Sequence, residues 1–353
     1  MAMTPKKNRD VVPDIEADPF GERSLTLFNK HLQLLGGRFQ FESNSPELLQ
    51  LVDAAYSGVP RHRLSTKAPD FRIRLLLSST RNARAPTKGQ RTSPRTEPPQ
   101  FAMLHGAGFL GCTTDSSNFV VMSERERAAL VVVSPQMLRF PYHVRYELIE
   151  FAVFALAARA QRLVPLHAAC VGHGGRGLLL MGPTGAGKST VSLHCLLDGF
   201  DFLSEDSVFV APKTLLATGV ANFLHVRGDS LRWLGGSREA TAIRKSPVIR
   251  RRSGVKKFEV DLRRAPFRLA QSPLKIIGIV FLSAQDAGAR PLLKLLPKKA
   301  VLGNLAAMQA YGASQPQWQS FIRKVSRLDS FELRRGRHPH ETVEVLRSVL
   351  ARP

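Results

Sequence analysis

The chain has 353 residues, 51 Lys and Arg against 28 Asp and Glu, and a formal net charge of +23. A hydrophobic content of 43% is typical of a globular protein with a real core, and the length allows one large domain or two ordinary ones. No apolar run reaches the roughly 18 residues of a membrane-spanning helix, and the N-terminus lacks the apolar stretch of a signal peptide. We therefore expect no membrane span and a cytoplasmic location.

The excess of basic residues is uneven along the chain. Two blocks, 81–95 and 238–268, hold much of it. Such charge attracts nucleic acids, anionic membranes and acidic or phosphorylated substrates. Arginine dominates lysine in these blocks, as it also does in proteins from GC-rich genomes, so we do not expect nucleic acid as a partner.

The three cysteines, Cys112, Cys170 and Cys195, are far apart and show no metal-ligand spacing. They are odd in number, which leaves at least one without a partner in the chain. We expect all of them to be buried thiols in a reducing compartment.

The N-terminal half predicts a disordered segment over 1–24 and an α+β accessory domain over 25–162. Within it, Ser45 should cap a helix over 46–57, with Pro46 and Glu47 in its first turn. Residues 78–99 lack large apolar side chains and are expected to be a disordered insertion. Alternation and apolar spacing predict strands at 71–77, 118–123 and 129–134, and an amphipathic helix over 142–161.

The second predicted domain covers 163–353. His173 lies in a glycine-rich turn and is expected at the surface, and Glu205 and Asp206 are expected in the middle of a strand. Residues 244–257 are expected to be a basic, mobile segment. The other predicted elements are two strands joined by the turn 173–177, a buried strand over 178–181, a helix over 188–197, strands over 201–212 and 276–283, and a helix over 340–351.

The segment GPTGAGKS, residues 182–189, matches the phosphate-binding pattern G-x-x-x-x-G-K-[ST] at every fixed position. Lys188 would bring a positive charge to the β- and γ-phosphates, and the Ser189 hydroxyl would bind Mg²⁺. A buried strand before the loop and an apolar-striped helix after it are the right context, so we expect ATP or GTP as ligand. The expected nucleotide-binding residues are Gly182, Pro183, Thr184, Gly185, Ala186, Gly187, Lys188, Ser189 and Thr190.

Two consecutive acids, Glu205 and Asp206, follow on the next expected strand. Neighbouring strand residues point to opposite faces, so the two acids should differ in role. We assign Asp206 to the metal and Glu205 to proton acceptance from an attacking hydroxyl. The alternative is that one of them is only a solvated strand acid.

His167 precedes Gly182 by 15 residues. A histidine there can hydrogen-bond a catalytic carboxylate and orient it. The alternative is a core histidine with ordinary partners. We count His167 as a catalytic candidate together with Glu205, Asp206 and Lys188.

This arrangement resembles the kinase domain of HPr kinase/phosphorylase, a serine kinase with a P-loop fold of the phosphoenolpyruvate-carboxykinase type. The resemblance rests on LHAACVG, GLLLMGPTGAGKST and GFDFLSEDSVFV, over about 166–211. It implies an α/β P-loop kinase domain, a catalytic role for His167, Glu205 and Asp206, and a homo-oligomer. The family usually has two aspartates where this chain has Glu205 and Asp206, and its arginine-bearing phosphorylase signature is not recognisable here.

Basic residues between the acids and the late core strand are candidates for the transition-state charge. By the resemblance, Lys256 or Lys257 should enter the site, with Arg227 and Arg232 as further candidates. A solvated basic loop is the alternative. A basic groove of this kind would suit an acidic peptide, a phosphate or a carboxylate.

The leading hypothesis is a Mg²⁺-dependent kinase that transfers the γ-phosphoryl group of ATP to a serine-type hydroxyl of a protein or peptide. A kinase for a small-molecule hydroxyl and a nucleotide-binding regulatory module are alternatives. A transport ATPase is disfavoured, because no LSGGQ-like signature occurs and the acids follow the loop too soon.

Overall fold

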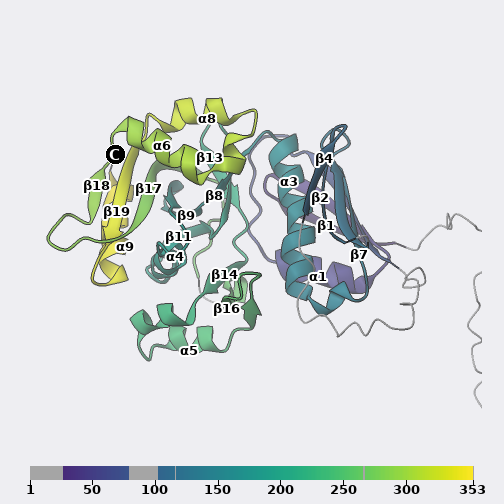
Figure 1. Cartoon of the computed structure of the whole chain (residues 1–353), viewed down its shortest axis with the longest axis horizontal. Helices are drawn as coiled ribbons and strands as arrows, with labels where there is room; N and C mark the ends of the chain where they lie inside the picture. Colours follow the sequence, from purple (N-terminus) through teal and green to yellow (C-terminus); the bar gives the residue numbers. More distant parts are fainter. Residues whose placement is uncertain (1–26, 79–101, 116, 265–266, 353) are drawn as a thin grey trace, which may run out of the picture.

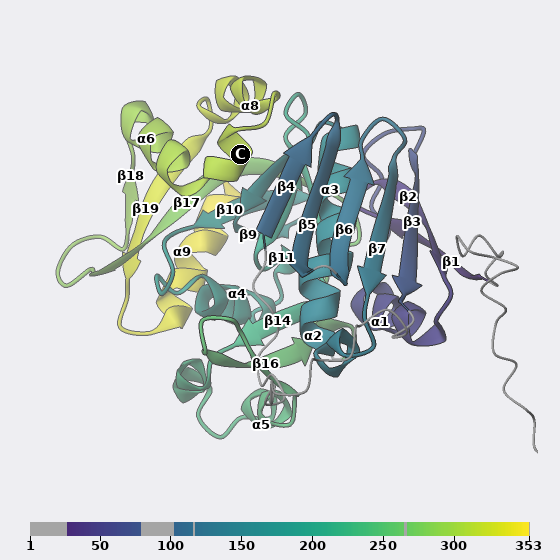
Figure 2. The same ribbon diagram turned by 45° about the vertical axis from the view of Figure 1, so that its right-hand side comes forward.

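The computed structural model describes residues 27–78, 102–115, 117–264 and 267–352. The predictions of disorder over 1–24 and over most of 78–99 lie outside these residues. The described chain is a mixed α/β protein with three β-sheets (Figures 1 and 2). No helix within the described ranges is long and apolar enough to cross a membrane.

The first sheet contains seven strands in the order β1-β2-β3-β7-β6-β5-β4 among the described residues. The three predicted strands are confirmed as β3, β6 and β7, and the predicted helix as α1. The strands are β1 (Phe28–Leu34), β2 (Gly37–Ser43), β3 (Asp70–Leu77), β4 (Ala102–Gly106), β5 (Phe109–Asp115), β6 (Asn118–Ser123) and β7 (Ala128–Val133). Helix α1 (Pro46–Tyr56) starts after Ser45, whose hydroxyl donates to Glu47 rather than capping a backbone N–H.

A long helical segment separates the first sheet from the second (Figure 2). It consists of a 3-10 turn (Met137–Arg139), α2 (Pro141–His143), a π-helical turn (Val144–Ile149) and α3 (Glu150–Ala160), which confirms the helix predicted over 142–161. Its apolar residues pack with α1 and the first sheet in one core. The same core reaches the second sheet, where the rings of Phe154 and Phe209 lie 5.2 Å apart.

The second sheet has nine strands in the described chain, with β10, β17 and β19 running parallel at its centre. The strands are β8 (Val164–His167), β9 (Ala169–His173), β10 (Arg176–Met181), β11 (Asp201–Ser204), β12 (Ser207–Val210), β13 (Leu216–Gly219), β17 (Leu274–Asp286), β18 (Leu293–Leu295) and β19 (Asp329–Arg335). The expected strand over 276–283 is therefore part of β17. His173 is exposed, as predicted.

Helices cover both faces of this sheet (Figure 1). In β10, Leu178 and Leu180 belong to one core and Leu179 and Met181 to the other. Burial on both faces explains the unbroken apolar runs of the central strands. One face carries α4 (Lys188–Leu197) and α9 (Pro339–Ala351), and the other carries α6 (Lys298–Met308), α7 (Ala310–Ala313) and α8 (Trp318–Val325).

The expected strand over 201–212 is broken at its centre. β11 pairs with β9, whereas β12 pairs with β8 and β13. The change of partner leaves Glu205 and Asp206 in the link between two strands. The sequence had suggested that the two acids alternate across one strand. The structure shows that they do not, because the strand is broken at this point.

The basic segment 244–257 is not an extended loop. Its ends contribute to β15 (Val248–Arg250) and β16 (Lys256–Asp261), which form a third sheet with β14 (Phe223–Val226). The strand order in this sheet is β14-β16-β15. Next to it lie a 3-10 helix (Gly228–Leu234), α5 (Arg238–Arg244) and a 3-10 turn (Leu262–Arg264). The pairing of β15 with β16 gives the ends of the segment regular structure, and its expected mobility stays a prediction.

Buried polar contacts join the N-terminal region to the rest. His62 lies 2.7 Å from the Thr218 hydroxyl and 2.9 Å from the Ala270 carbonyl oxygen. Arg145 forms a buried ion pair with Glu259. A domain boundary near residue 162 stays a prediction, and these contacts show that the two regions share an interior.

All three cysteines are free and buried, as expected. Burial raises the pKa of the Cys112 thiol to about 12. At neutral pH the thiol is therefore protonated and chemically inert.

Candidate functional site

The glycine-rich loop between β10 and α4 turns sharply. Gly185 and Gly187 have φ angles of +84° and +98°, which residues with a Cβ rarely adopt. A Cβ on Gly182 would lie 2.9 Å from the Leu282 carbonyl oxygen, so only glycine allows this approach to β17. The first N–H groups of α4 have no helical acceptor, and they can bind an anion.

Lys188 and Ser189 begin α4, and their side chains already have defined partners. Lys188 Nζ donates to the Gly182 carbonyl oxygen over 2.6 Å. Partial burial lowers the pKa of Lys188, although the charges of Asp206 and Glu205 oppose this. Ser189 Oγ donates to Glu205 Oε1 over 2.6 Å. A cation and a hydroxyl are thus placed at the mouth of the glycine loop.

Thr190 is the last of the expected nucleotide-binding residues, and its side chain has a partner outside the glycine loop. Its hydroxyl lies 3.0 Å from the Ser230 hydroxyl, in the 3-10 helix after β14. Both residues line the same cavity as the loop. Thr190 therefore ties the start of α4 to the wall opposite the loop.

Glu205 is buried and is bonded through both carboxylate oxygens. Besides Ser189, it accepts from the His225 backbone N–H at 2.8 Å, and it lies 3.0 Å from His225 Nδ1. Burial alone would raise the pKa of Glu205, but the bonds to His225 and Ser189 and the charge of Lys257 outweigh it and lower the pKa to about 2. Glu205 is consequently a carboxylate at every physiological pH.

Asp206 has a different environment. Its carboxylate is partly exposed and lies 3.3 Å from His167 Nδ1 and 3.6 Å from the Arg251 guanidinium. His167 ends β8, and the pairing of His167 with Ser207 brings it beside Asp206. Gln309 holds the His167 backbone by two hydrogen bonds of 2.8 Å and 3.0 Å. Of the two acids, His167 thus pairs with Asp206 and not with Glu205.

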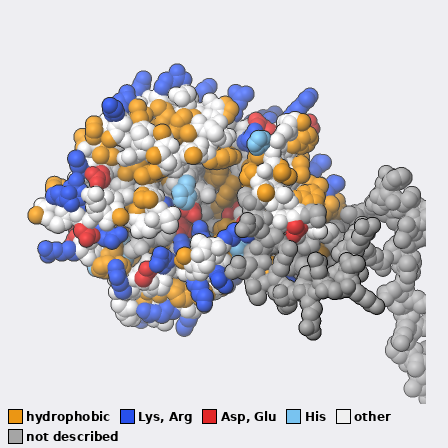
Figure 3. All heavy atoms as spheres, in the orientation of Figure 1, with side chains coloured by type: hydrophobic (Ala, Val, Ile, Leu, Met, Phe, Trp, Pro, Cys, Tyr) orange, Lys and Arg blue, Asp and Glu red, His pale blue; other side chains and the backbone are white. Residues whose placement is uncertain are grey.

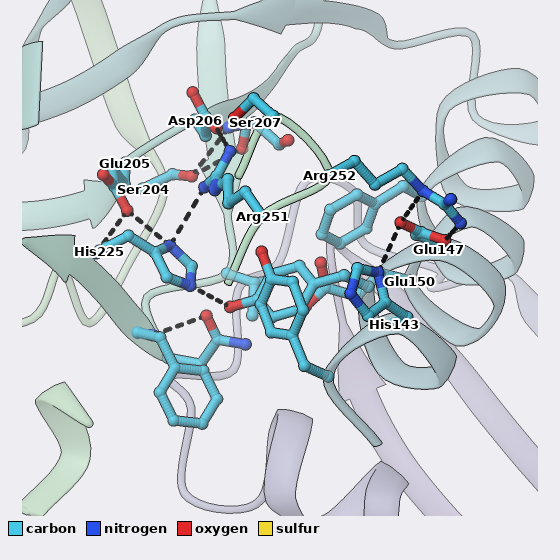
Figure 4. A pocket seen from close by; sticks show the side chains of 17 residues that line it. His143, Glu147, Glu150, Ser204, Glu205, Asp206, Ser207, His225, Arg251 and Arg252 are labelled. Carbon is cyan, nitrogen blue, oxygen red and sulfur yellow. Dashed lines mark hydrogen bonds and ion pairs between the residues drawn. The ribbon is translucent and has the colours of Figure 1, made fainter. Parts of the chain in front are cut away.

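Two cavities meet at these acids. The loop cavity, about 600 Å³, is bounded by residues 183–191 of the glycine loop and α4, by His167 and by the start of α9. The helix cavity, about 370 Å³, is bounded by the helical segment 142–154 and by β14. Glu205, Asp206 and Arg251 line both. Figure 3 shows acidic and histidine side chains in a hollow at the middle of one face, and Figure 4 shows Arg251 between His225 and Asp206.

The basic residues chosen from the sequence divide into two groups. Lys257 lines the loop cavity, and burial lowers its pKa, whereas its neighbour Lys256 is exposed and lines neither cavity. Arg227 and Arg232 line the outer part of the loop cavity. Arg227 is 3.0 Å from Asp229, and the Arg232 guanidinium stacks on the Trp233 ring at 4.7 Å.

The described residues contain no group of three or more His, Cys, Asp or Glu side chains that could hold a metal ion. Ser189 Oγ and Glu205 Oε1 lie 2.6 Å apart at the start of α4. A divalent cation bound here would therefore need oxygens from a ligand as well. The expected role of Asp206 as a metal ligand stays a prediction.

Sequence reasoning missed His225, which connects Glu205 to the N-terminal region. His225 Nε2 lies 3.0 Å from the Tyr146 hydroxyl and 3.5 Å from Glu259. Burial lowers the pKa of His225, but its bonds to Glu205 and Glu259 outweigh this and raise it overall. The only sequence signal for His225 was its position in a short apolar strand, two residues before Arg227. That signal is weak.

Comparisons with known proteins give little more. No family model matches the chain, and no curated protein is similar to it. One solved structure that resembles it in part is the Hpr(Ser) kinase/phosphatase from Coxiella burnetii, with 13% sequence identity and a TM-score of 0.25. The match covers 53% of this chain and 87% of that one. Likeness at this level is distant and carries no argument about activity.

Proposed function

We propose that the protein is an ATP-dependent kinase that transfers the γ-phosphoryl group to a hydroxyl. One observation carries the proposal: a glycine loop with Lys188 and Ser189 shares a single cavity with the Asp206–His167 pair. A loop of this geometry suits the phosphates, and a carboxylate positioned by a histidine suits proton removal from an alcohol. The family resemblance seen in the sequence favours the same reaction.

The contacts favour a division of labour that reverses the one assigned from sequence. Glu205 has both oxygens occupied and a pKa of about 2, so it is a poor proton acceptor. Its role would be to hold the Ser189 hydroxyl. Asp206 is partly exposed to both cavities and would accept the proton. Lys188 and Arg251 would offset the phosphate charge.

Ser189 and Glu205 supply hard oxygen donors, which are the ligands that Mg²⁺ prefers, so the residues fit this ion. When bound, Mg²⁺ would neutralise phosphate charge. In the transfer, the acceptor oxygen forms a bond to the γ-phosphorus, and the bond from that phosphorus to the β,γ-bridging oxygen breaks. The hydroxyl proton goes to Asp206, and ADP leaves.

The test uses γ-labelled ATP, Mg²⁺ and a panel of serine peptides and small alcohols. Lys188→Ala should lose both nucleotide binding and transfer. Asp206→Asn should retain nucleotide binding by calorimetry but lose about 10²–10⁴-fold in transfer rate. Lys213→Ala, at an exposed lysine away from both cavities, is the control.

A regulatory nucleotide-binding module remains the second candidate function. It is favoured by the fully bonded state of Glu205, which holds the site in order without any acceptor. Tight nucleotide binding with no transfer to any acceptor or to water would sink the kinase and leave this module. A failure to bind nucleotide would sink both.

A further inference from the structure

The helix cavity reaches Asp206 without passing through the loop cavity. It shares Glu205, Asp206, Arg251 and Ser253 with the loop cavity. Its other wall comes from the N-terminal region, through Tyr142, Tyr146, Glu150 and Phe154. A molecule in this cavity would therefore lie next to Asp206 while phosphates occupied the glycine loop. The question is which chemistry the cavity selects.

Most of the charged side chains along this wall have a charged partner. Glu147 lies 2.8 Å from His143 Nδ1 and also pairs with Arg252 (Figure 4). Glu205 pairs with His225 at 3.0 Å. Glu147 therefore has a cationic partner in Arg252, and Glu205 has a partner in His225.

Glu150 is the exception. Its side chain lines the cavity, is only 6% exposed, and forms no ion pair within 4.0 Å with any residue in the described ranges. Burial raises the pKa of Glu150 to about 7, although the charges of Arg145 and His225 and the Asn222 amide act to lower it. A buried carboxylate without a cation is costly, and a cationic ligand would supply the missing partner.

Aromatic rings complete the wall beside Glu150. Tyr142 and Tyr146 line the cavity, with ring centroids 4.6 Å apart. Burial raises the pKa of Tyr142 to about 12, so its phenol stays neutral. Tyrosine faces attract cations through the ring quadrupole. The Tyr146 ring already has the Arg145 guanidinium 4.9 Å from its centroid, so the Glu150 carboxylate and the Tyr142 ring are the groups that suit an ammonium group.

We propose that the helix cavity is the acceptor site and that the acceptor is a primary alcohol carrying an ammonium group. Two sources share this chemistry, a free amino alcohol and the N-terminal serine of a peptide. The ammonium group would contact Glu150 and the hydroxyl would face Asp206. The proposal rests on the proposed kinase function and names its substrate class.

The volume of the helix cavity and the charge of Glu150 both restrict which acceptors can bind. About 370 Å³ lies at the small end of ligand cavities, so it admits a small molecule or one terminal residue. The serine of a folded protein surface would not enter it. An acidic acceptor, which the basic segments had suggested, would bring a carboxylate to the wall that already holds the unpaired Glu150.

The test is equilibrium binding to the full chain without nucleotide, measured by calorimetry. The probes are ethanolamine and the peptide Ser-Gly-Gly, each compared with its N-acetylated form, which is neutral at the amine. The ammonium probe should bind at least about tenfold more tightly than its acetylated form, as a buried charge-assisted contact predicts. Binding of the peptide alone identifies an N-terminal serine as the acceptor, and binding of ethanolamine as well identifies a free amino alcohol.

Two variants and one control make the result specific. Glu150→Gln should abolish the preference for the ammonium probe. Tyr142→Leu should weaken the binding of that probe several-fold while keeping the wall apolar. Glu124→Gln, at a partly exposed carboxylate that pairs with Arg159 at 3.3 Å, should behave as the wild type. Thermal melting checks that each variant is folded.

The affinity for ethanolamine should also rise between about pH 6 and about pH 8, because Glu150 ionises in this window while an alkylammonium stays charged. The ionisable groups facing Glu150 are Tyr56 of α1, Tyr142, Arg145 and Tyr146 of its own helical segment, His225 of β14 and Glu259 of β16. The pH dependence should vanish in Glu150→Gln.

Equal binding of ammonium and acetylated probes, absence of binding by both ammonium probes, or an unchanged preference in Glu150→Gln would overturn the proposal. Phosphoryl transfer is a separate readout. If the ammonium probes bind as expected but no transfer occurs, the kinase function fails and the ammonium site stands. If transfer occurs only to neutral or acidic acceptors, this proposal fails and the kinase stands.

Discussion

The loop cavity and the helix cavity share the wall of Glu205, Asp206 and Arg251, but they are assembled in different ways. The loop cavity takes its main contacts from one continuous segment, 183–191, whose shape follows from glycine backbone angles. The helix cavity takes its contacts from the helical segment 142–154, β14 and the β15–β16 hairpin, which meet only in the folded chain. Changes in the first cavity should therefore act on ligand binding alone, whereas changes in the second should also act on folding.

The buried Arg145–Glu259 pair gives the strongest test of this difference. Arg145 is 6% exposed, and its guanidinium also lies over the Phe223 ring at 4.4 Å. Arg145→Met would leave Glu259 buried with only His225 beside it, which should lower the free energy of unfolding by about 3–5 kcal/mol. Urea denaturation measures the change.

The matched control for that change is Arg159→Met, on the same helix but at a partly exposed pair with Glu124. It should cost at most about 1 kcal/mol. Equal losses in the two variants would contradict the idea that buried contacts between the regions hold the helix cavity.

A substitution at Arg251 tests the role of the wall that the two cavities share. It lies between Asp206 and His225, and its buried Nε has no hydrogen-bond partner among the described residues. Arg251→Ala should lower the transfer rate by about 10²–10³-fold, as the loss of one charge-stabilising donor does in other enzymes. Nucleotide affinity should change much less. A loss confined to nucleotide affinity would place Arg251 in the loop cavity alone.

Glu150 of the helix cavity makes the stability of the fold depend on pH. Its pKa is raised from 4.5 to about 7 in the folded chain, so ionisation disfavours folding and stability falls as pH rises through this window. Glu150→Gln lacks this loss. It should match the wild type near pH 4.5 and exceed it at pH 8 by on the order of 1–3 kcal/mol. A variant less stable than the wild type at pH 8 in thermal melts would contradict this.

The smallest expected effect is a difference in nucleotide affinity between variants at two neighbouring lysines. Lys257 lines the loop cavity, and Lys256 is exposed outside it. Lys257→Ala should weaken nucleotide binding about tenfold, the size of one charge contact, and leave the melting temperature almost unchanged. Lys256→Ala should bind nucleotide as the wild type does. Calorimetry that found equal effects would show that Lys257 acts only through overall charge.

The glycine loop could be predicted because its members are adjacent in sequence. A buried strand before Gly182 and a helix from Lys188 set its context, and both are present in the structure. The paired strands and helices of the first sheet could also be predicted, since their apolar periodicity is regular. These features depend on local sequence.

The contacts of the two acids could not be predicted in this way. The break between β11 and β12 follows from a change of pairing partner, and the position of His167 beside Asp206 follows from strand register. His225 and Glu150 come from segments that are distant in sequence from Glu205. Such positions depend on tertiary pairing, and no local pattern announces them.

The π-helical turn at Val144–Ile149 has a consequence for how the cavity could change over generations. A π turn holds one residue more than an α turn over a similar span, and it occurs often at functional sites. Removal of one codon from this stretch would restore an α turn over the same span, so the residues after it would keep their places on the helix. Glu150 and Phe154 would then stay on the cavity wall, and the change would be confined to the turn that carries Tyr146 and Glu147. A single deletion could thus reshape one part of the wall while the rest keeps its register.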